Sequence, residues 1–259
     1  MPEIKLAIGL RVYEKTREAL ALKMRFLGNI PWNVVSKVFV AVNVEKDKSG
    51  ALEYFNVVLA DPRIEAFPVQ PWGQNVPALN AIVFKAARES FTHLCFISTK
   101  VVIDHSLLLS MLGLFDSETL VVGAVVGGHD FKSQEDGLPT SVEGTGRTVP
   151  YNTCIVWDVR RLSRTSFHWV SEMPYNKELA GLEEFATIIE QQQRFSKGTE
   201  AKLVNLGPIE TQTEHWDKDR ADRHQKIILE KERKANAQIE LLECGGWRPI
   251  IWHFNQVRQ

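Results

Sequence analysis

Short apolar runs alternate with amphipathic segments along most of this chain. The runs are typical of buried strands and occupy residues 4–10, 37–44, 63–69, 94–97, 119–128, 149–159 and 201–207. The segments between them repeat apolar residues at helical spacing and predict helices over 16–30, 47–59, 75–90, 104–115 and 178–198, with a short helix or turn at 160–167. Repeated strand and helix units indicate a mostly parallel sheet covered on both faces. The pattern predicts an α/β fold.

Local signals mark where several of these helices begin and end. Thr16 and Asp104 stand in front of two helices, where a side-chain oxygen can accept hydrogen bonds from the first turn. Pro77 lies near the first turn of the third helix, where proline is tolerated. Gly198 ends the helix that begins at residue 178.

Two regions depart from the alternation. Residues 129–148 are polar and glycine-rich without periodicity, and they predict a long surface loop of the kind that is often functional. Residues 217–243 are densely charged and predict a long, mostly solvated helix that packs on the core or on a partner, as in an oligomer. Residues 244–254 are interpreted as a tail folding back over the core. The expected division is a domain of residues 1–207 and a C-terminal extension of residues 208–259.

Composition narrows the class of protein. The chain has 259 residues, of which 44% are hydrophobic and 24% charged, and its formal net charge is -1. That balance gives no electrostatic reason to expect a nucleic-acid partner. Three widely spaced cysteines favour reduced, buried thiols and a cytoplasmic location. The N-terminal segment lacks the apolar core of a signal peptide, and no apolar run approaches spanning length.

Three polar residues follow the apolar run that begins at Leu94. In "LCFISTKVVIDHSLL" (94–108), the run stops at Ser98, Thr99 and Lys100 before a new helix starts after Asp104. The carboxyl ends of strands in open α/β sheets are where ligands bind. These hydroxyls and the ammonium are therefore candidate binding groups.

Three motifs in order carry a family resemblance. The first, "ALNAIVFKAARESFTHLCFISTKVVIDHSLL" (78–108), has an asparagine, Asn80, in a helix before a strand that ends at Ser98 and Lys100. The others are "YNTCIVWDVRRLSRTSF" (151–167) and "AGLEEFATIIEQQQRFSKGTEAKLV" (180–204). Over residues 4–207 the chain resembles a GT-A fold glycosyltransferase of the family-2 type. The resemblance implies a three-layer fold, with Ser98 and Lys100 at the two positions of the family's Asp-x-Asp motif and Glu184 at its catalytic base.

The resemblance implies a sugar transfer from a nucleoside-diphosphate sugar to an unknown acceptor, which could be a glycan, a lipid-linked compound or a protein, with inversion. Such a reaction needs a carboxylate to take the proton of the acceptor hydroxyl and a cation to stabilise the departing diphosphate. Glu184, with Glu183 beside it, is the candidate base. The simpler interpretation is that acidic residues at a helix start only stabilise the helix.

The same resemblance implies a divalent ion, Mg²⁺ or Mn²⁺, held by the Asp-x-Asp carboxylates. Ser98 and Lys100 cannot build that site, so no cofactor is expected. An ammonium binds phosphate directly, and Lys100 could replace the ion. The alternative is that the motif was lost in a catalytically inactive, GT-A-shaped binding or scaffold protein. His215, His224 and His253 are expected to be packed or exposed rather than metal ligands.

The expected nucleotide cradle lies at the ends of the first two strands. Arg11 and Tyr13 follow the first strand, and Asn43, Glu45 and Asp47 follow the second. Ser98, Thr99 and Asn80 complete the candidate binding set, although each could be an ordinary loop or core residue. Residues 129–148 and the C-terminal tail are expected to close over the donor. A nucleotidyltransferase is disfavoured because "GLRVYEKTRE" (9–18) lacks a glycine- and lysine-rich loop.

Overall fold

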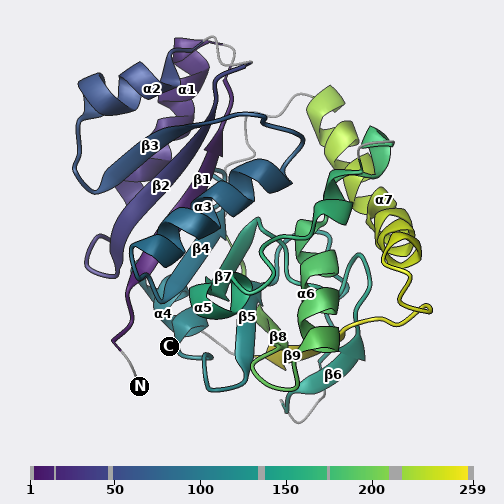
Figure 1. The fold of residues 1–259 in the computed structure, drawn as a ribbon. Helices are drawn as coiled ribbons and strands as arrows, with labels where there is room; N and C mark the ends of the chain where they lie inside the picture. The colour runs from purple at the N-terminus through teal and green to yellow at the C-terminus, as the bar shows by residue number, and fades with distance from the viewer. Residues whose placement is uncertain are drawn as a thin grey trace.

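The computed structural model describes residues 3–14, 16–45, 49–133, 138–173, 176–209 and 218–255, apart from the side chains of 218–225 and 227. Within these ranges the strands form one nine-stranded sheet in the order β3-β2-β1-β4-β7-β5-β8-β9-β6 (Figure 1). The strands are β1 (Leu6–Val12), β2 (Val35–Asn43), β3 (Ile64–Val69), β4 (His93–Ile97), β5 (Thr119–Ala124), β6 (Thr140–Glu143), β7 (Cys154–Asp158), β8 (Glu200–Asn205) and β9 (Ile250–Asn255). The fold is α/β, as predicted.

The sheet is mostly parallel. Strands β1, β2, β3 and β4 pair in parallel, as do β5, β8 and β9. The antiparallel pairs are β4 with β7, β5 with β7, and β6 with β9. Strand β7 therefore joins two parallel halves, and the carboxyl ends of β1 and β4 lie side by side next to it.

Helices cover both faces of the sheet. The chain forms α1 (Arg17–Met24), α2 (Ala51–Glu53), α3 (Val76–Arg88), α4 (His105–Leu112), α5 (Val159–Leu162), α6 (Glu183–Arg194) and α7 (Lys218–Leu241), with a π-helix at Tyr54–Leu59 and 3₁₀ turns at Arg25–Asn29, Trp169–Glu172 and Lys177–Leu179. One apolar core lies between the sheet and α3, α5 and α6, and a second lies between the sheet and α1, α2 and α4. The three-layer arrangement is visible in Figure 1.

Strand alternation explains why two cores form. In β4, Leu94 and Phe96 pack into the core under α3, whereas Cys95 and Ile97 face the core under α4. Successive side chains of a strand point to opposite faces, so a strand buried on both faces is apolar throughout. This is the pattern that the sequence shows at residues 94–97.

The predicted helix starts at Thr16 and Asp104 are confirmed. Thr16 accepts a hydrogen bond from the amide of Ala19, and Asp104 accepts one of 2.6 Å from the amide of Leu107. Pro77 lies in the first turn of α3. The helix expected at residue 178 begins later, at Glu183, because Gly181 and Leu182 have left-handed backbone angles of +104° and +59° in φ and interrupt it.

The sheet contains two strands that the apolar pattern did not predict. Residues 140–143, expected in a surface loop, form β6, and residues 250–255, expected in a folded-back tail, form β9. Strand β6 is four residues long with every second residue exposed, and a run that short carries little hydrophobic signal.

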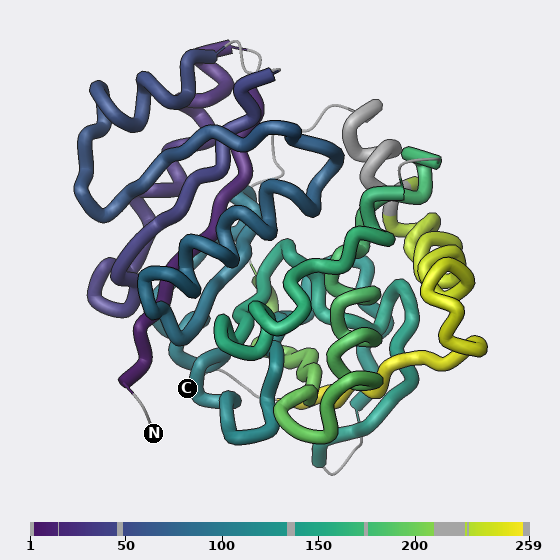
Figure 2. Tube along the Cα trace, viewed as in Figure 1, coloured from purple at the N-terminus to yellow at the C-terminus, as the bar shows by residue number. Residues whose placement is uncertain are grey.

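Helix α7 packs beside α6 and beside the 3₁₀ turns at Trp169–Glu172 and Lys177–Leu179, as Figures 1 and 2 show. Ala235, Gln238 and Ile239 are the buried residues of its described part. Because β9 pairs with β8, the chain after α7 returns to the same sheet. The domain division at residue 207 stays a prediction. In the described part of the chain, no helix has the length and apolar character needed to cross a bilayer.

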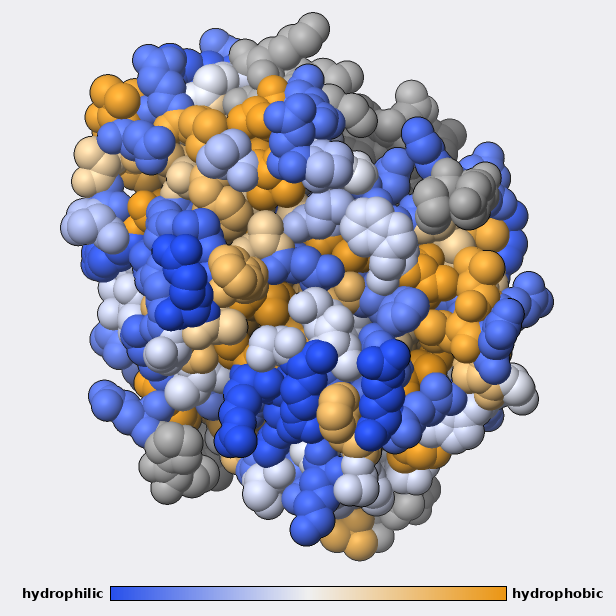
Figure 3. Space-filling view, viewed as in Figure 1, coloured by the Kyte–Doolittle hydropathy of each residue, from blue (hydrophilic) through white to orange (hydrophobic). Residues whose placement is uncertain are grey.

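The surface seen in Figure 3 is mixed. Hydrophobic side chains appear there as patches separated by hydrophilic ones. Among the described residues, large apolar side chains that remain exposed include Val57, Phe84 and Trp169. They lie on separate elements, so this surface does not identify the functional site. Ligand sites in open α/β sheets lie at the carboxyl ends of the strands.

Candidate active site

A large cavity opens at the carboxyl ends of β1 and β4. Its volume is about 1430 Å³. Parallel pairing sets Gly9 of β1 beside Phe96 of β4. A Cβ on Gly9 would lie 2.7 Å from the Phe96 ring, so only glycine lets that ring lie against β1 at the base of the cavity.

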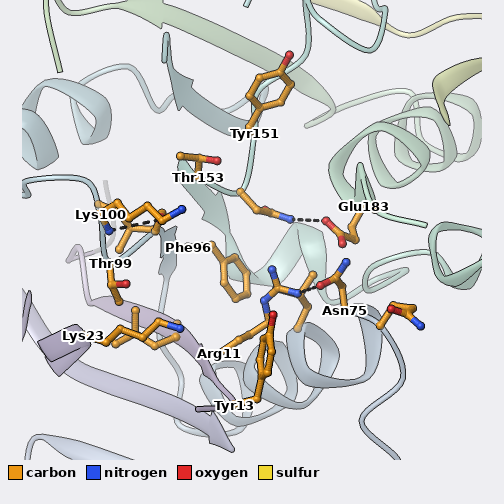
Figure 4. Close-up of a pocket in the computed structure, with 18 of the residues that line it drawn as sticks. Arg11, Tyr13, Lys23, Asn75, Phe96, Thr99, Lys100, Tyr151, Thr153 and Glu183 are labelled. Carbon is orange, nitrogen blue, oxygen red and sulfur yellow. Dashed lines mark hydrogen bonds between the residues drawn. The ribbon is translucent and has the colours of Figure 1, made fainter. Parts of the chain in front are cut away.

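One wall of the cavity is basic. Arg11, Lys23 and Lys100 line it, and they come from β1, α1 and the turn after β4 (Figure 4). Arg11 donates a hydrogen bond to Oδ1 of Asn75, which fixes the guanidinium. Lys23 pairs with Glu14 at 2.6 Å. Arg11 and Lys100 are therefore two cations that border the cavity. The hydrogen bond to Asn75 holds Arg11 in place.

The Ser98-Thr99-Lys100 segment forms a tight turn at the end of β4. The amide of Ser98 donates to the carbonyl oxygen of Thr153 at 2.8 Å, and the amide of Val101 donates back to the Ser98 carbonyl at 2.9 Å. The amide of Lys100 donates to Oγ of Ser98 at 3.4 Å. Figure 4 shows the Lys100 side chain extending toward the middle of the cavity.

A loop next to the basic wall is held by a buried carboxylate. Glu172, 4% exposed, accepts hydrogen bonds of 2.6 Å from the amides of Gln74 and Asn75 and a further one from the amide of Val76. These amides form the start of α3, which favours a negative charge. Glu172 thereby fixes Asn75, the residue that holds Arg11.

The opposite wall carries two acidic residues. Glu183 and Glu184 begin α6 and are 5% and 3% exposed. Both oxygens of Glu184 accept hydrogen bonds from Asn152, one from its amide at 3.2 Å and one from Nδ2 at 3.1 Å. Nδ2 of Asn152 also lies 3.5 Å from Glu183. In Figure 4, Glu183 and Lys100 reach into the cavity from opposite sides.

The charges on this acidic wall are strongly perturbed. Burial raises the pKa of Glu184 well above its usual range, and the neighbouring charge of Glu183 raises it further. Lys231 of α7 lines the same part of the cavity, and burial lowers its pKa. Perturbed titratable groups that gather in a cavity are typical of catalytic sites.

Seven of the predicted site residues line this one cavity. They are Arg11, Tyr13, Ser98, Thr99, Lys100, Glu183 and Glu184. Two arguments predicted from the sequence that these residues share a site: the carboxyl ends of parallel strands meet at one edge of a sheet, and the family resemblance implies a common site. Their roles remain predictions.

Three other predicted binding residues are described, and none lines the cavity. Asn80 binds the backbone of Phe167 through both ends of its amide, at 3.0 and 2.7 Å, so it holds a loop of the core. Asn43 is buried and accepts from the amide of Glu45 at 3.1 Å, while Glu45 itself is exposed. Asp47 lies outside the described residues.

Several lining residues were not anticipated. They include Trp72, Asn75, Asn152, Lys231 and Lys234. Asn152 lies in the motif at residues 151–167. A polar residue directly before an apolar strand is a signal that could have identified it as a site residue. Lys231 and Lys234 lie in a helix dense with charge, where the sequence gives no means of telling a cavity lysine from a solvated one.

The residues at the end of β4 do not fit a divalent metal ion. Hydroxyls and an ammonium replace the carboxylates that hard cations prefer. Within the described ranges, no group of three or more His, Cys, Asp and Glu side chains could hold a metal. His253 is packed, as expected: its Nδ1 accepts from the Lys132 amide at 2.9 Å and its Nε2 lies 3.0 Å from the Thr148 carbonyl. His215 and the side chain of His224 lie outside the described residues.

Comparison with known proteins finds similarity in fold and not in sequence. No protein-family model matches the chain, and no curated protein is similar to it in sequence. TarS of S. aureus (residues 1–349) superposes with a TM-score of 0.52 and 13% identity, covering 94% of this chain and 74% of that one. Glucosyl-3-phosphoglycerate synthase from Mycobacterium tuberculosis, in complex with Mn²⁺, UDP and glucosyl-3-phosphoglycerate, gives a TM-score of 0.53 and 14% identity over 93% of this chain and 80% of that chain.

A further match is less extensive. A mannosyltransferase from Pyrobaculum calidifontis, in complex with GDP-Man and Mn²⁺, covers 62% of this chain with a TM-score of 0.46 and 13% identity, and this chain spans 46% of it. The structural neighbours are GT-A fold glycosyltransferases, and the α/β fold of this chain matches theirs.

Proposed function

We propose that this protein transfers a sugar from a nucleoside-diphosphate sugar to an acceptor hydroxyl, with inversion and without a metal ion. The observation that carries the proposal is a single cavity in which Lys100 and Arg11 face Glu183 and Glu184. TarS, a neighbour in fold, also has a structure in complex with UDP, with a TM-score of 0.51. That complex supports a nucleotide ligand for this cavity.

The basic wall is the proposed donor side. Lys100 and Arg11 would bind the diphosphate through charge-assisted hydrogen bonds, which are shorter and stronger than neutral ones. Tyr13 lies 6.2 Å from Trp72, centroid to centroid, at the same edge of the cavity, and these rings offer an apolar surface for the base. Ser98 and Thr99 add hydroxyl donors beside Lys100.

Glu184 is the proposed general base. Its carboxylate would take the proton as the acceptor oxygen bonds to the anomeric carbon. The bond from that carbon to the diphosphate oxygen breaks, and Lys100 stabilises the negative charge that the diphosphate gains. Asn152 holds both Glu184 oxygens and so would orient the carboxylate toward the cavity.

The rival function is a nucleotide-binding or scaffold protein without turnover. One observation favours it: burial raises the pKa of Glu184, so the carboxyl is largely protonated at neutral pH and cannot accept a proton. A base with a raised pKa is nevertheless a stronger base in the ionised fraction. Turnover therefore has to be measured.

The test combines binding with turnover. Thermal shift against nucleoside diphosphates and their sugars, with and without a chelator, should show stabilisation that the chelator does not change. Hydrolysis of the stabilising donor sugar should then be lost in Glu184→Gln. Nucleotide binding without hydrolysis would support the scaffold, and unchanged hydrolysis in Glu184→Gln would remove Glu184 from the proposal.

The cysteines support a reducing compartment. All three are free thiols, and Cys95 and Cys154 are buried in β4 and β7. Burial raises the pKa of the Cys95 thiol, which makes it unreactive. We therefore retain a cytoplasmic location as part of the proposal. An association through residues 217–243 also remains a proposal, and the described part of α7 already packs on its own chain.

A further inference from the structure

Two lysines of α7 border the acidic end of the cavity. Lys231 and Lys234 are one helical turn apart, and both line the cavity with Glu183 and Glu184. They come from a different part of the chain than Arg11, at the carboxyl end of β1, and Lys100, in the turn after β4. The cavity therefore has two separate sources of positive charge.

The Lys231 ammonium is held in a fixed position. Its Nζ lies 2.7 Å from the centre of the Tyr151 ring, and the His129 ring stacks on Tyr151 at 3.8 Å with an angle of 15°. Since both groups lie within 4 Å of the same ring centre, they must cover opposite faces of it. The Tyr151 hydroxyl donates to the carbonyl of Gly146 at 2.9 Å, which fixes the ring in turn. Such a support limits the entropy lost when a ligand binds.

Helix α7 is attached firmly at this point. The amide of Gly146 donates to Glu232 at 2.9 Å, and a Cβ on Gly146 would lie 2.2 Å from the Lys231 carbonyl oxygen, so the loop and the helix are in backbone contact. Lys234 Nζ donates to the carbonyl of Ala180 at 2.6 Å, and Gln238 donates to that of Gly181 at 2.7 Å. The lysines therefore keep their positions relative to the start of α6.

The charges of these lysines are incompletely balanced. Burial lowers the pKa of both. The charges of Glu184 and Glu183 oppose that effect on Lys231, and the charges of Glu183 and Glu230 oppose it on Lys234, in each case without a hydrogen bond. The described residues supply neither lysine with a carboxylate in ion-pair contact, and the Arg233 and Lys226 pairs of α7 involve other acids. A partly desolvated cation is stabilised by an anion that reaches it.

We propose that Lys231 and Lys234 form a subsite for an anionic group, a phosphate or a carboxylate, carried by the hydroxyl compound that accepts the sugar. The subsite rests on the proposed function insofar as it places the acceptor hydroxyl next to Glu184. Since Glu183 and Glu184 begin α6 beside this subsite, an acceptor anchored by its anion presents a nearby hydroxyl to the base. Neutral sugars and alcohols lack the group that these lysines bind.

The test measures small anionic alcohols by isothermal titration calorimetry on the full chain. The probes are glycerol 1-phosphate, glycerate and glycerol, and UDP and GDP are titrated separately. Glycerol 1-phosphate or glycerate should bind at least about tenfold more tightly than glycerol, the free-energy difference expected for a charged hydrogen bond. The comparison of the two anions shows which group fits better.

Variants assign the binding to α7. Lys231→Met should weaken the anion by about tenfold or more, Lys234→Met should weaken it less because that ammonium also binds Ala180, and Lys231→Arg should retain it. Lys226→Met, an exposed lysine of the same helix, should leave the affinity within about twofold. Circular dichroism and the melting temperature confirm that each variant is folded.

The subsite would be overturned if glycerol bound as tightly as its phosphate and glycerate, or if the anion affinity were unchanged in both Lys231→Met and Lys234→Met. Loss of UDP or GDP affinity in place of anion affinity would also overturn it, by assigning the lysines to the donor. Anion binding that depends on Lys231 in a protein that binds no nucleoside diphosphate would support the subsite and contradict the proposed function.

Discussion

Two clusters in this molecule contain the same residue types and behave in opposite ways. At the outer edge of the sheet, Glu65 and Glu89 meet Lys37 and Lys85 in close ion pairs, with side chains 20% to 32% exposed. In the cavity, Glu183 and Glu184 meet Lys231 and Lys234 without such pairs and with far less solvent around the acids. We call the first the edge cluster and the second the cavity cluster.

The pKa values separate the two clusters. Burial alone would raise the pKa of Glu65, but hydrogen bonds from Lys37 and Lys85 outweigh it and lower the pKa to about 2. Burial alone would lower the pKa of Lys37, but Glu65 and Glu89 raise it. In the cavity cluster burial prevails, so the pKa of Glu184 rises and that of Lys231 falls. Charges that form ion pairs stabilise a fold. Buried groups whose pKa values are shifted against their charged form are typical of sites that bind a ligand or transfer a proton.

The largest expected difference between the clusters is in turnover. Glu184→Gln should lower the turnover of the donor sugar by about 100-fold or more, because general base catalysis contributes that much. Glu65→Gln, its matched control in the edge cluster, should leave turnover within about twofold. Steady-state kinetics on both variants makes the comparison, and equal losses in the two would show that the clusters do not differ in function.

A second test concerns the residue that holds the base. Asn152→Ala removes the Nδ2 donor but keeps the amide that donates to Glu184. Loss of a hydrogen bond to the carboxylate favours its protonated form, so the pKa of Glu184 should rise further. Turnover should fall by about tenfold, and the rising limb of its pH profile should move to higher pH. A lower rate with an unmoved pH profile would indicate a merely structural role for Asn152.

The contributions of Glu184 and Glu65 to the stability of the fold should depend on pH in opposite directions. The folded pKa of Glu184 is raised, so its contribution to stability is present below its unfolded pKa and is lost as pH rises through the folded value. Glu184→Gln should therefore stabilise the fold by about 1 to 3 kcal/mol at about pH 8 and change little at about pH 5. The folded pKa of Glu65 is lowered to about 2, so its contribution is present above its unfolded pKa and is lost as pH falls through about 2.

Melting curves at the two pH values measure this effect. A change of 1 kcal/mol shifts the melting temperature of a chain of this size by roughly 2 to 4 °C. A Glu184→Gln variant that is less stable at alkaline pH than the parent would mean that the ionised carboxylate is paired after all.

The smallest expected effect lies in the edge cluster. Lys37→Met removes the ammonium that pairs with Glu65 and Glu89, at 2.6 and 2.7 Å, and that lies 5.1 Å from the centre of the Phe39 ring. Partly exposed pairs contribute little, so the free energy of unfolding should fall by about 1 kcal/mol or less. Chemical denaturation measures it, and a much larger loss would show that the edge cluster is more than a solvated network.

The sequence predicted most of the fold because its strands are buried on both faces. Continuous apolar runs such as residues 94–97 carry a strong signal, and caps at Thr16 and Asp104 set helix starts to within a residue. Strand β6 was missed because its four residues alternate at an edge, and β9 because an apolar C-terminal run is equally typical of a packed tail.

The candidate site was predictable only where position in the sheet determines it. Arg11 lies at the carboxyl end of β1 and Lys100 follows the adjacent parallel strand β4, so topology places them at the same edge of the sheet. Asn80 and Asn43 do not line the cavity, and the sequence could not show this, because an asparagine has the same sequence signal whether it binds a ligand or the backbone. The position of Lys231 depends on how α7 packs beside Tyr151, which lies 80 residues earlier in the chain, and periodicity does not encode such a contact.

The most direct test of the central claim is a calorimetric titration of UDP and GDP in the presence of EDTA, on the parent and on Lys100→Met. If an ammonium takes the place of a bridging ion, at least one nucleotide binds without metal, and its affinity falls by about tenfold or more in the variant. Absence of binding until Mn²⁺ or Mg²⁺ is added, or equal affinity in the variant, would contradict the account.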